Sequence, residues 1–577
     1  MKFGQLLSVV LIAGLVGVAT NVGYTYFTSD KPHPDEVKFN SFLDENWQDT
    51  MEKSPLFASL LGDKRYDDKI SSNSIDDFIA ESEYERYVLD VLNEINPNNL
   101  SEENQLNYRL LKSDYEINLE GRKYPGYYMR LNQRGGVQDY YLYGNRLNFV
   151  DLQSYKNWFE RVKGYTQNVR NSLEINREGL ELGYTQPKLV TRGVSAQIGA
   201  MLERDLEDHP YYKIFKSVGE VASAQEAEEL QNEVKDYIQN VLNPTYQELY
   251  DFLVNEYLPK SRDSIGISDV PNGKEWYEYL ARYHTTTDLT PDEIHEIGLR
   301  EVAKIRAEME GIIEQVGWDG DFNSFLQYLR TDPRFYFETG EELLQAYRAM
   351  SKEIDAYMPT LFNKLPRAPY GVIPIPMESA PFTTTAYYNA PSEGRPGYYY
   401  ANLYMPEVRP KYEIPVLSVH EAVPGHHHQI SLAQEMENVP NFRKYLSITA
   451  FVEGWGLYSE QLGESMGIYD DPYDKFGQLT YDMWRAVRLV VDTGMHYKSW
   501  SRDDAVNLFL ENTAKTEQDI NNEVDRYIAW PGQALAYKIG QLKIMELRDK
   551  SKEALGEDFD IKDFHDHILS FGSIPLN

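Results

Sequence analysis

A cluster of histidines with one carboxylate is the part of the chain best suited to chemistry. Four of the eleven histidines, His420, His426, His427 and His428, fall within nine positions of one another, and Glu421 lies among them. Neutral imidazoles are the usual protein ligands of zinc, and a carboxylate beside them can act as a general base. The segment therefore predicts a catalytic zinc site. The competing interpretation is a surface histidine cluster that binds metal adventitiously or not at all.

The spacing of these histidines differs from the common helical zinc motif. That motif places two histidines at i and i+4 on one face of a helix, but position i+4 from His420 is Pro424, which cannot bind metal. Proline kinks a helix, and Gly425 permits backbone dihedrals that other residues resist. We therefore expect the helix to be interrupted after Val423, so that the extra residues loop out and return His426 toward His420.

The neighbouring histidines are rivals for the role of second ligand. By helical phase His427 would face the same side as His420, but it would lie about two turns, roughly 10 Å, further along the axis. That separation is too large for one metal ion, so His426 is the preferred second ligand. His427 and His428 stay open as alternatives.

A catalytic zinc needs a third protein ligand, with the fourth position left for water. Glu453 is the best candidate, because it lies in a stretch, residues 451–460, that reads as a buried helix with few acidic residues. A buried carboxylate is costly unless it is paired or bound to a metal. Glu460 lies seven residues further on the same face, and we expect it to support the ligands indirectly or to be an ordinary acid on the helix surface.

The motifs resemble those of the bacterial family named domain of unknown function 885, which is marked by an H-E-x-x-P-G-H segment followed by an E-G-W segment. In this chain the two segments are residues 420–426 and 453–455, and the pattern continues at 492–496 and 525–533. The resemblance covers most of residues 280–577 and, more loosely, 45–280. Members of the family resemble helical zinc peptidases, which use two histidines and one glutamate as metal ligands.

The resemblance also implies roles for residues downstream of the ligands. Peptide hydrolysis passes through a tetrahedral oxyanion that needs a hydrogen-bond donor, and in the helical zinc peptidases a tyrosine or histidine from a C-terminal helix supplies it. The matching positions are His496 and Tyr527, for which a buried, hydrogen-bonded histidine and a core tyrosine are the alternatives. Arg526 is expected either to pair with a substrate carboxylate or to form a structural salt bridge. By analogy, residues 398–403 are expected to be an edge strand that pairs with extended substrate.

Mostly helical elements must position these residues. Apolar residues recurring at spacings of three and four predict helices over 80–95, 150–182, 222–256, 291–316, 341–363 and 502–512. Thr290, followed by Pro291 and Glu293, predicts a capped helix start. Ten prolines between residues 364 and 415 forbid long helices there. The β-forming residues between these prolines predict short strands just before the metal-binding segment.

Composition and the N-terminus narrow the class of protein. The net charge of −34 over 577 residues argues against a nucleic-acid partner. The absence of cysteine excludes a Cys-based zinc site, a thiol nucleophile, a disulfide and lipidation at an N-terminal cysteine. Lys2 and the apolar run at residues 6–19 predict an export signal, which is either cleaved or retained as a membrane tether.

The sequence thus predicts a mainly α-helical, zincin-like protein with a deep cleft and a small β element before the metal-binding helix. We expect a signal peptide or anchor over 1–29, a linker over 30–45, a helical region over 46–364 and a metal-site region over 365–577, in one continuous catalytic body. The expected protein is an exported periplasmic or extracellular zinc peptidase acting on peptide substrates.

In this prediction His420, His426 and Glu453 hold Zn²⁺, and Glu421 is the general base. A zinc amidase acting on cell-wall peptides is one alternative, and a non-catalytic metal-binding or scaffold protein is another. The sequence does not decide between exo- and endopeptidase action, and it leaves side-chain preference and oligomeric state open.

Overall fold

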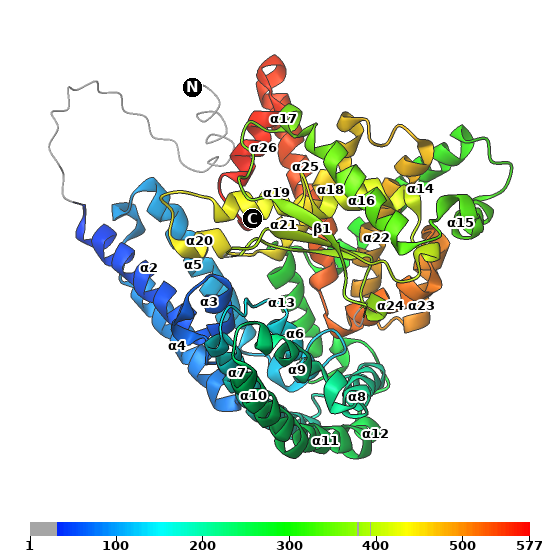
Figure 1. Ribbon diagram of the computed structural model, residues 1–577. Coiled ribbons are helices and arrows are strands. Elements are labelled where there is room, and N and C mark those ends of the chain that lie inside the picture. Colours follow the sequence, from blue (N-terminus) through cyan, green and yellow to red (C-terminus); the bar gives the residue numbers. More distant parts are fainter. Residues whose placement is uncertain (1–31, 378–379, 393) are drawn as a thin grey trace.

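The chain folds mainly into helices, as the sequence predicts (Figure 1). The computed structural model describes residues 32–377, 380–392 and 394–577. The predicted signal peptide or anchor at 1–29 lies outside these residues. Within the described ranges, no helix is both long enough and apolar enough to cross a membrane.

The elements fall into two helical sets separated by a small sheet. The helices before the sheet are α2 (Pro34–Lys53), α3 (Pro55–Leu60), α4 (Ile75–Asn93), α5 (Glu102–Gly121), α6 (Tyr141–Gly144), α7 (Leu152–Leu182), α8 (Lys188–Leu202), α9 (Pro210–Lys213), α10 (Ala224–Tyr237), α11 (Asn243–Phe252), α12 (Leu258–Lys260), α13 (Gly273–Thr285), α14 (Pro291–Gln315), α15 (Phe322–Thr331), α16 (Gly340–Asp355) and α17 (Met358–Leu361). The strands are β1 (Tyr370–Pro374), β2 (Ala386–Asn389) and β3 (Gly397–Ala401). The helices after the sheet are α18 (Ile414–Glu421), α19 (His426–Gln434), α20 (Asn441–Tyr445), α21 (Thr449–Met466), α22 (Pro472–Tyr497), α23 (Arg502–Asn512), α24 (Glu517–Ala529), α25 (Ala536–Leu555) and α26 (Ile561–Leu569).

The start of α14 follows the predicted capping pattern. The Thr290 hydroxyl accepts a hydrogen bond from the Glu293 backbone N–H at 3.2 Å, and the Glu293 carboxylate accepts one from the Thr290 N–H at 2.9 Å. These two bonds satisfy N–H groups that have no partner inside the helix.

The linker expected over residues 30–45 is wrong from Pro34 onward, where α2 begins. Proline is well tolerated in the first turn of a helix, where its missing N–H would have had no partner. Phe39, Phe42 and Leu43 are buried in a cluster with residues of α4 and α5. These apolar residues recur at spacings of three and four. Their burial favours a helix, although the segment begins with polar residues and prolines.

The predicted short strands form a three-stranded sheet in the order β1-β3-β2. β1 runs parallel to β3, with Val372 opposite Tyr399, and β2 runs antiparallel to β3, with Tyr388 opposite Tyr399. The expectation that residues 398–403 form an edge strand is therefore wrong, because β3 is the central strand and both of its sides are paired. β1 and β2 are the edges of this sheet.

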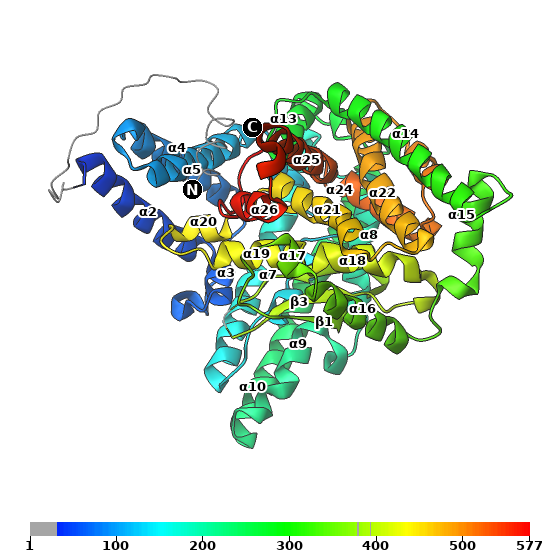
Figure 2. The same cartoon turned by 90° about the horizontal axis from the view of Figure 1, so that it is seen from above.

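Close helix packing at glycines fixes the elements around the site. Gly298 of α14 lies against Leu489 and Val490 of α22, and a Cβ at position 298 would come 2.8 Å from both side chains. Gly454 of α21 faces Gly540 of α25 so closely that a Cβ on either would clash with the other helix. Figure 2 shows α14 beside α22, and α21 beside α25. Glycine thus sets the spacing of the helices that carry the candidate site.

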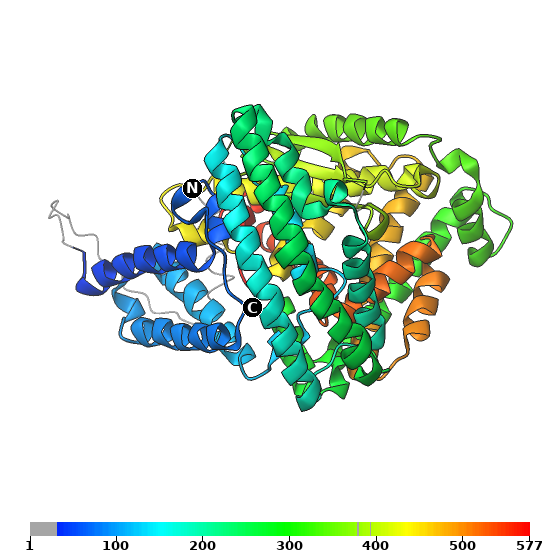
Figure 3. The same ribbon diagram turned by 60° about the horizontal axis from the view of Figure 1, so that its bottom comes forward.

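The region before the sheet packs around its own apolar core and also touches the helices that follow the sheet. Long helix α7 lies along α11 (Figure 3), and their buried residues belong to one hydrophobic cluster. Gln133, in the loop between α5 and α6, donates a hydrogen bond to the backbone carbonyl of Asp525 in α24 at 3.1 Å. Residues before position 365 therefore contribute to the surroundings of α24.

Candidate metal centre

The predicted interruption lies between α18 and α19. α18 ends at Glu421, the chain turns through the cis Val423–Pro424 bond, and α19 begins at His426. The Gly425 N–H donates to the Val419 carbonyl at 3.0 Å, and a Cβ at position 425 would clash with the carbonyl oxygen of His420. Only glycine fits this close approach of the backbone. The resulting turn brings His426 back toward His420.

His420, His426 and Glu453 come together at this turn. One ligand atom from each lies within 4.8 Å of the others. Glu453 Oε2 is 3.8 Å from His420 Nε2 and 3.5 Å from His426 Nε2. The two imidazole rings stand almost perpendicular, with centroids 4.7 Å apart. Burial raises the pKa of Glu453, but the two histidines outweigh it and hold that pKa well below its usual value.

A carboxylate behind His420 orients its ring. His420 Nδ1 donates to Glu460 Oε1 at 2.8 Å, and Arg485 Nη2 lies 3.3 Å from the same oxygen. This contact fixes the orientation of the ring, with Nε2 facing Glu453. Glu460 is fully buried, so of the two roles considered for it the structure favours the support of a ligand.

The candidate general base lies beside the cluster. Glu421 is the last residue of α18, and its side chain is buried. Burial raises its pKa above the ordinary value, and the negative charge of Glu453 acts in the same direction, whereas His420 and His426 lower it. A carboxyl group with a raised pKa, next to candidate metal ligands, is suited to exchange protons with a reacting water.

His427 and His428 face elsewhere. His427 Nε2 donates to the Ala368 carbonyl at 3.0 Å, and its Nδ1 accepts from the Tyr388 hydroxyl at 2.8 Å. His428 packs against Phe362, with ring centroids 4.2 Å apart. The fold therefore gathers His426, and neither of its two neighbours, with His420 and Glu453.

His496 does not point a free nitrogen at the cluster. Its Nδ1 accepts from the Ile267 N–H at 3.1 Å, and its Nε2 donates to the Tyr527 carbonyl at 3.0 Å. The ring is fully buried, and burial lowers its pKa to about 3. The expectation that His496 stabilises an oxyanion is therefore wrong: both ring nitrogens are used to join α22 to backbone groups far away in sequence.

Tyr527 is also committed to structural bonds. Its hydroxyl accepts from Trp484 Nε1 at 2.8 Å and from Arg488 Nε at 2.7 Å, and it donates to Glu523 Oε2 at 2.8 Å. With one donor and two acceptor positions used, this hydroxyl has none left for substrate. Tyr527 is therefore a core tyrosine, which was the alternative to an oxyanion donor. The oxyanion role expected for it is wrong.

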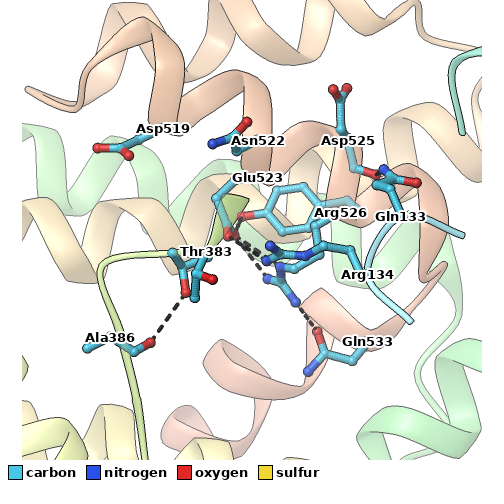
Figure 4. A network of polar contacts seen from close by, with 12 residues as sticks. Gln133, Arg134, Thr383, Ala386, Asp519, Asn522, Glu523, Asp525, Arg526 and Gln533 are labelled. Carbon is cyan, nitrogen blue, oxygen red and sulfur yellow. Dashed lines mark hydrogen bonds and ion pairs between the residues drawn. The ribbon is translucent and has the colours of Figure 1, made fainter. Parts of the chain in front are cut away.

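Arg526 forms the structural salt bridge that the sequence left open as an alternative. Its Nε and Nη2 lie 3.2 and 3.1 Å from Glu523 Oε2, and its Nη1 donates to Gln533 Oε1 at 2.6 Å. Figure 4 shows Arg526, Glu523 and Gln533 together, with Arg134 beside them. Arg134 Nη2 is 3.8 Å from Glu523 Oε1.

Sequence reasoning missed Tyr537, a partly buried residue of α25. Burial raises its pKa; the charge of Glu453 raises it further, and Arg526 and Arg488 lower it. The Arg488 guanidinium lies 4.4 Å from the centre of the Tyr537 ring. Tyr537 is thus within electrostatic range of both the metal cluster and the arginine network. The family motif at residues 525–533 ends just before Tyr537, so it indicated this part of the chain but did not include this residue.

Comparison with known proteins identifies the family of the chain and solved structures with a similar fold. A family profile described as "Bacterial protein of unknown function (DUF885)" matches residues 55–577. The crystal structure of a "putative lipoprotein" from Colwellia psychrerythraea is 27% identical, with a TM-score of 0.88 over 94% of this chain and 97% of that one. A "putative lipoprotein of unknown function" from Shewanella oneidensis is 17% identical, with a TM-score of 0.72 over 93% of this chain and 98% of that one. The second likeness concerns the fold alone. No curated protein sequence matches the chain.

Proposed function

The chain belongs to the DUF885 family of bacterial proteins of unknown function, and we propose that it is an exported zinc-dependent peptidase. The observation that carries this proposal is the convergence of His420, His426 and Glu453, whose ligand atoms lie within 4.8 Å of one another. Two histidines and one glutamate are a ligand set of catalytic zinc sites, which keep a fourth position for water.

The separations in the cluster suit a tetrahedral ion. Ligands at zinc distances of ~2.0–2.2 Å lie roughly 3.3–3.6 Å apart in a tetrahedron. The observed separations from Glu453 Oε2 to the two histidine nitrogens, 3.5 and 3.8 Å, are close to this range. The hydrogen bond from His420 to Glu460 is the kind of outer contact that holds a zinc-binding imidazole in place.

The chemistry proposed is hydrolysis of a peptide bond. When bound, zinc lowers the pKa of a coordinated water and polarises the substrate carbonyl. Glu421 takes a proton from the attacking water as the water oxygen adds to the carbonyl carbon and gives a tetrahedral oxyanion. Glu421 then passes the proton to the leaving amine as the oxyanion collapses and the C–N bond breaks. A zincin-like cleft over the centre belongs to the same proposal.

Tyr537 is the proposed oxyanion donor in place of His496 and Tyr527. Tyr537 lies three residues before Gly540, which packs directly against Gly454 beside Glu453. A hydrogen bond with the Gln533 side chain lowers the pKa of its phenol and leaves the O–H able to donate, whereas the polar atoms of the other two are bound by structural partners. A hydrogen-bond donor that stabilises developing negative charge contributes strongly to acyl-transfer catalysis.

Export supports a peptidase that acts outside the cytoplasm. The similar protein from Colwellia psychrerythraea is described as a "putative lipoprotein", and the N-terminal apolar run of this chain has the pattern of an export signal. The chain has no cysteine to carry a lipid, so we propose that any membrane attachment uses the apolar segment itself. An amidase acting on cell-wall peptides shares this chemistry and location and is the second candidate. A non-catalytic metal-binding scaffold is disfavoured by the intact Glu421.

Metal analysis combined with peptide cleavage tests the proposal. Purified protein should hold about one zinc per chain and should cleave members of a mixed peptide library. A chelator should abolish cleavage, and added zinc should restore it. Zinc-loaded protein that leaves peptides intact but cleaves cell-wall amides would select the amidase. Protein that binds no zinc under these conditions would overturn the metal site itself.

A further inference from the structure

Two buried arginines, one from α22 and one from α24, share one carboxylate oxygen. Glu523 Oε2 lies 3.0 Å from Arg488 Nη2 and 3.1 Å from Arg526 Nη2. The side chains of both arginines are 7% exposed, and that of Glu523 is 2% exposed. Among the described residues, the other hydrogen-bond partners of these two guanidinium groups, Tyr527 and Gln533, carry no charge.

The pairing leaves one positive charge in excess. A buried ion is costly unless an opposite charge and hydrogen bonds compensate it, and one carboxylate balances only one of the two guanidinium groups. Arg134 lies 3.8 Å from the other oxygen of Glu523 as a third cation. The nearby buried acid Asp492 has a pKa raised by burial to about 7, although Arg526 and Arg488 lower it. In a chain with a net charge of −34, such a local excess of buried cations points to an anionic partner.

Two donors face away from Glu523. Arg488 Nη1 is buried and has no hydrogen-bond partner among the described residues. Arg526 Nη1 donates to Gln533, whose neutral side chain is partly exposed (Figure 4). If the Gln533 amide leaves Arg526 and Tyr537, Arg526 Nη1 becomes a second donor that an incoming group can bind. A carboxylate supplies the two acceptor oxygens and the negative charge that these donors lack.

Tyr537 links this charge to the metal cluster. The Arg488 guanidinium covers the Tyr537 ring at 4.4 Å, and Tyr537 lies three residues before Gly540, which packs directly against Gly454 beside Glu453. A peptide whose scissile carbonyl lies at the metal centre can therefore extend a short C-terminal end past Tyr537 toward the arginines. The acidic groups at the centre, Glu421, Glu453 and Glu460, would repel a carboxylate placed on their own side.

We propose that Arg488 and Arg526 bind the C-terminal carboxylate of a peptide substrate, so that the protein removes residues from the C-terminus. This inference rests on the proposed peptidase activity. It adds the class of substrate, a peptide with a free C-terminal carboxylate, and it assigns two specificity-determining residues.

Matched free-acid and C-terminal amide forms of one mixed peptide library test the inference on zinc-loaded protein. Mass spectrometry should show the free-acid form shortened from its C-terminus at least ~10-fold faster than the amide form, since the amide lacks the charged acceptor. Equal rates for the two forms, or cleavage mainly at internal bonds, would overturn the inference while leaving the peptidase proposal intact. The absence of cleavage in both forms would overturn both.

Gln533→Glu provides a variant expected to fold well. It places a carboxylate of the chain itself beside the two arginines, where it should raise Tm and compete with the substrate carboxylate. The acid-to-amide rate ratio should fall toward one, with zinc content unchanged. A stable, zinc-loaded Gln533→Glu variant with an undiminished ratio would contradict the assignment.

Arg488→Gln and Arg488→Lys give an independent measurement. Arg488→Gln should raise KM for free-acid peptides ~10- to 100-fold with little change for amides, and Arg488→Lys should restore part of the preference because it keeps the charge. Arg443→Gln, at a buried arginine bonded to Asn107 at 2.7 Å, controls for the loss of a buried guanidinium. It should lower Tm without changing the acid-to-amide ratio. An equal change of that ratio in Arg443→Gln would count against a direct role for Arg488.

Discussion

Gly456 of α21 lies against the imidazole ring of His420. A Cβ at position 456 would come 2.8 Å from the ring Cε1 and 3.1 Å from Nε2, the nitrogen that faces Glu453. The same helix holds the ring by the hydrogen bond from Nδ1 to Glu460. The position of the candidate ligand is therefore set by an absent side chain and by a buried carboxylate, both on α21.

Gly456→Ala is expected to weaken zinc binding by ~10- to 100-fold, because the methyl group displaces the His420 ring from its place in the cluster. Alanine itself favours a helix by about 1 kcal/mol over glycine, so the helix should not be the cause. Competition with a chelator of known affinity measures the effect. Gly311→Ala in α14, where a Cβ meets nothing within 4 Å, is the matched control and should bind zinc like the unchanged protein.

His426→Ala should remove zinc, whereas His427→Ala should retain it. His426 Nε2 lies 3.5 Å from Glu453, but both ring nitrogens of His427 are bonded to Tyr388 and Ala368. Loss of these bonds should lower the unfolding free energy in His427→Ala by about 1–3 kcal/mol. Metal content and thermal unfolding of the two variants check the assignment. The reverse pattern, with zinc lost only in His427→Ala, would overturn the ligand set.

Glu421→Gln should retain zinc while hydrolysis falls by ~10²–10⁴-fold, because glutamine keeps the shape of the side chain but cannot accept the proton. Metal content and kcat measured on the same preparation separate the two effects. Glu437→Gln, at an exposed position after α19, should change neither. Full activity in the Glu421→Gln variant would contradict the proposed mechanism.

Tyr537→Phe should lower kcat by ~10²–10³-fold with little change in KM, as expected for a lost oxyanion donor. Phenylalanine keeps the ring beneath Arg488, so the arginine network should stay in place. Tyr527→Phe is the comparison: it removes the bonds to Glu523 and Arg488 and should act mainly on Tm. If Tyr527→Phe lowers kcat and Tyr537→Phe acts mainly on Tm, Tyr527 is the oxyanion donor.

Asp492→Asn should make the stability of the protein less dependent on pH. Burial raises the pKa of Asp492 from 3.8 to about 7, although bonds from Tyr277 and from the Gly532 N–H lower it. Because the folded pKa lies above the unfolded one, this group stabilises the fold below about pH 4, and stability is lost as pH rises toward 7. The loss is on the order of a few kcal/mol. Denaturation at a series of pH values should show a flatter profile in Asp492→Asn over this window, and an unchanged slope would refute the assignment.

The sequence determined the helical character, the interruption between Glu421 and His426, and the identity of the candidate ligands that the fold gathers. Each of these follows from local chemistry. Thr290 and Glu293 cap a helix because they are three residues apart, and Pro424 with Gly425 interrupts a helix whatever packs around it. The cost of burying an unpaired carboxylate singled out Glu453. For the same local reason, the predicted short strands appear where prolines exclude helices.

Only the tertiary structure decided which partner each buried polar group has. His496 could be recognised as a conspicuous histidine, but the two backbone groups that bind its ring belong to Ile267 and Tyr527, at distant positions in the chain. Strand order is equally non-local, so β3 proved to be central and not an edge. The sharing of Glu523 by Arg488 and Arg526 also depends on how α22 packs against α24. Hydrogen-bond partners and buried charge balance arise from contacts between remote segments, and the spacing of residues along the chain does not encode them.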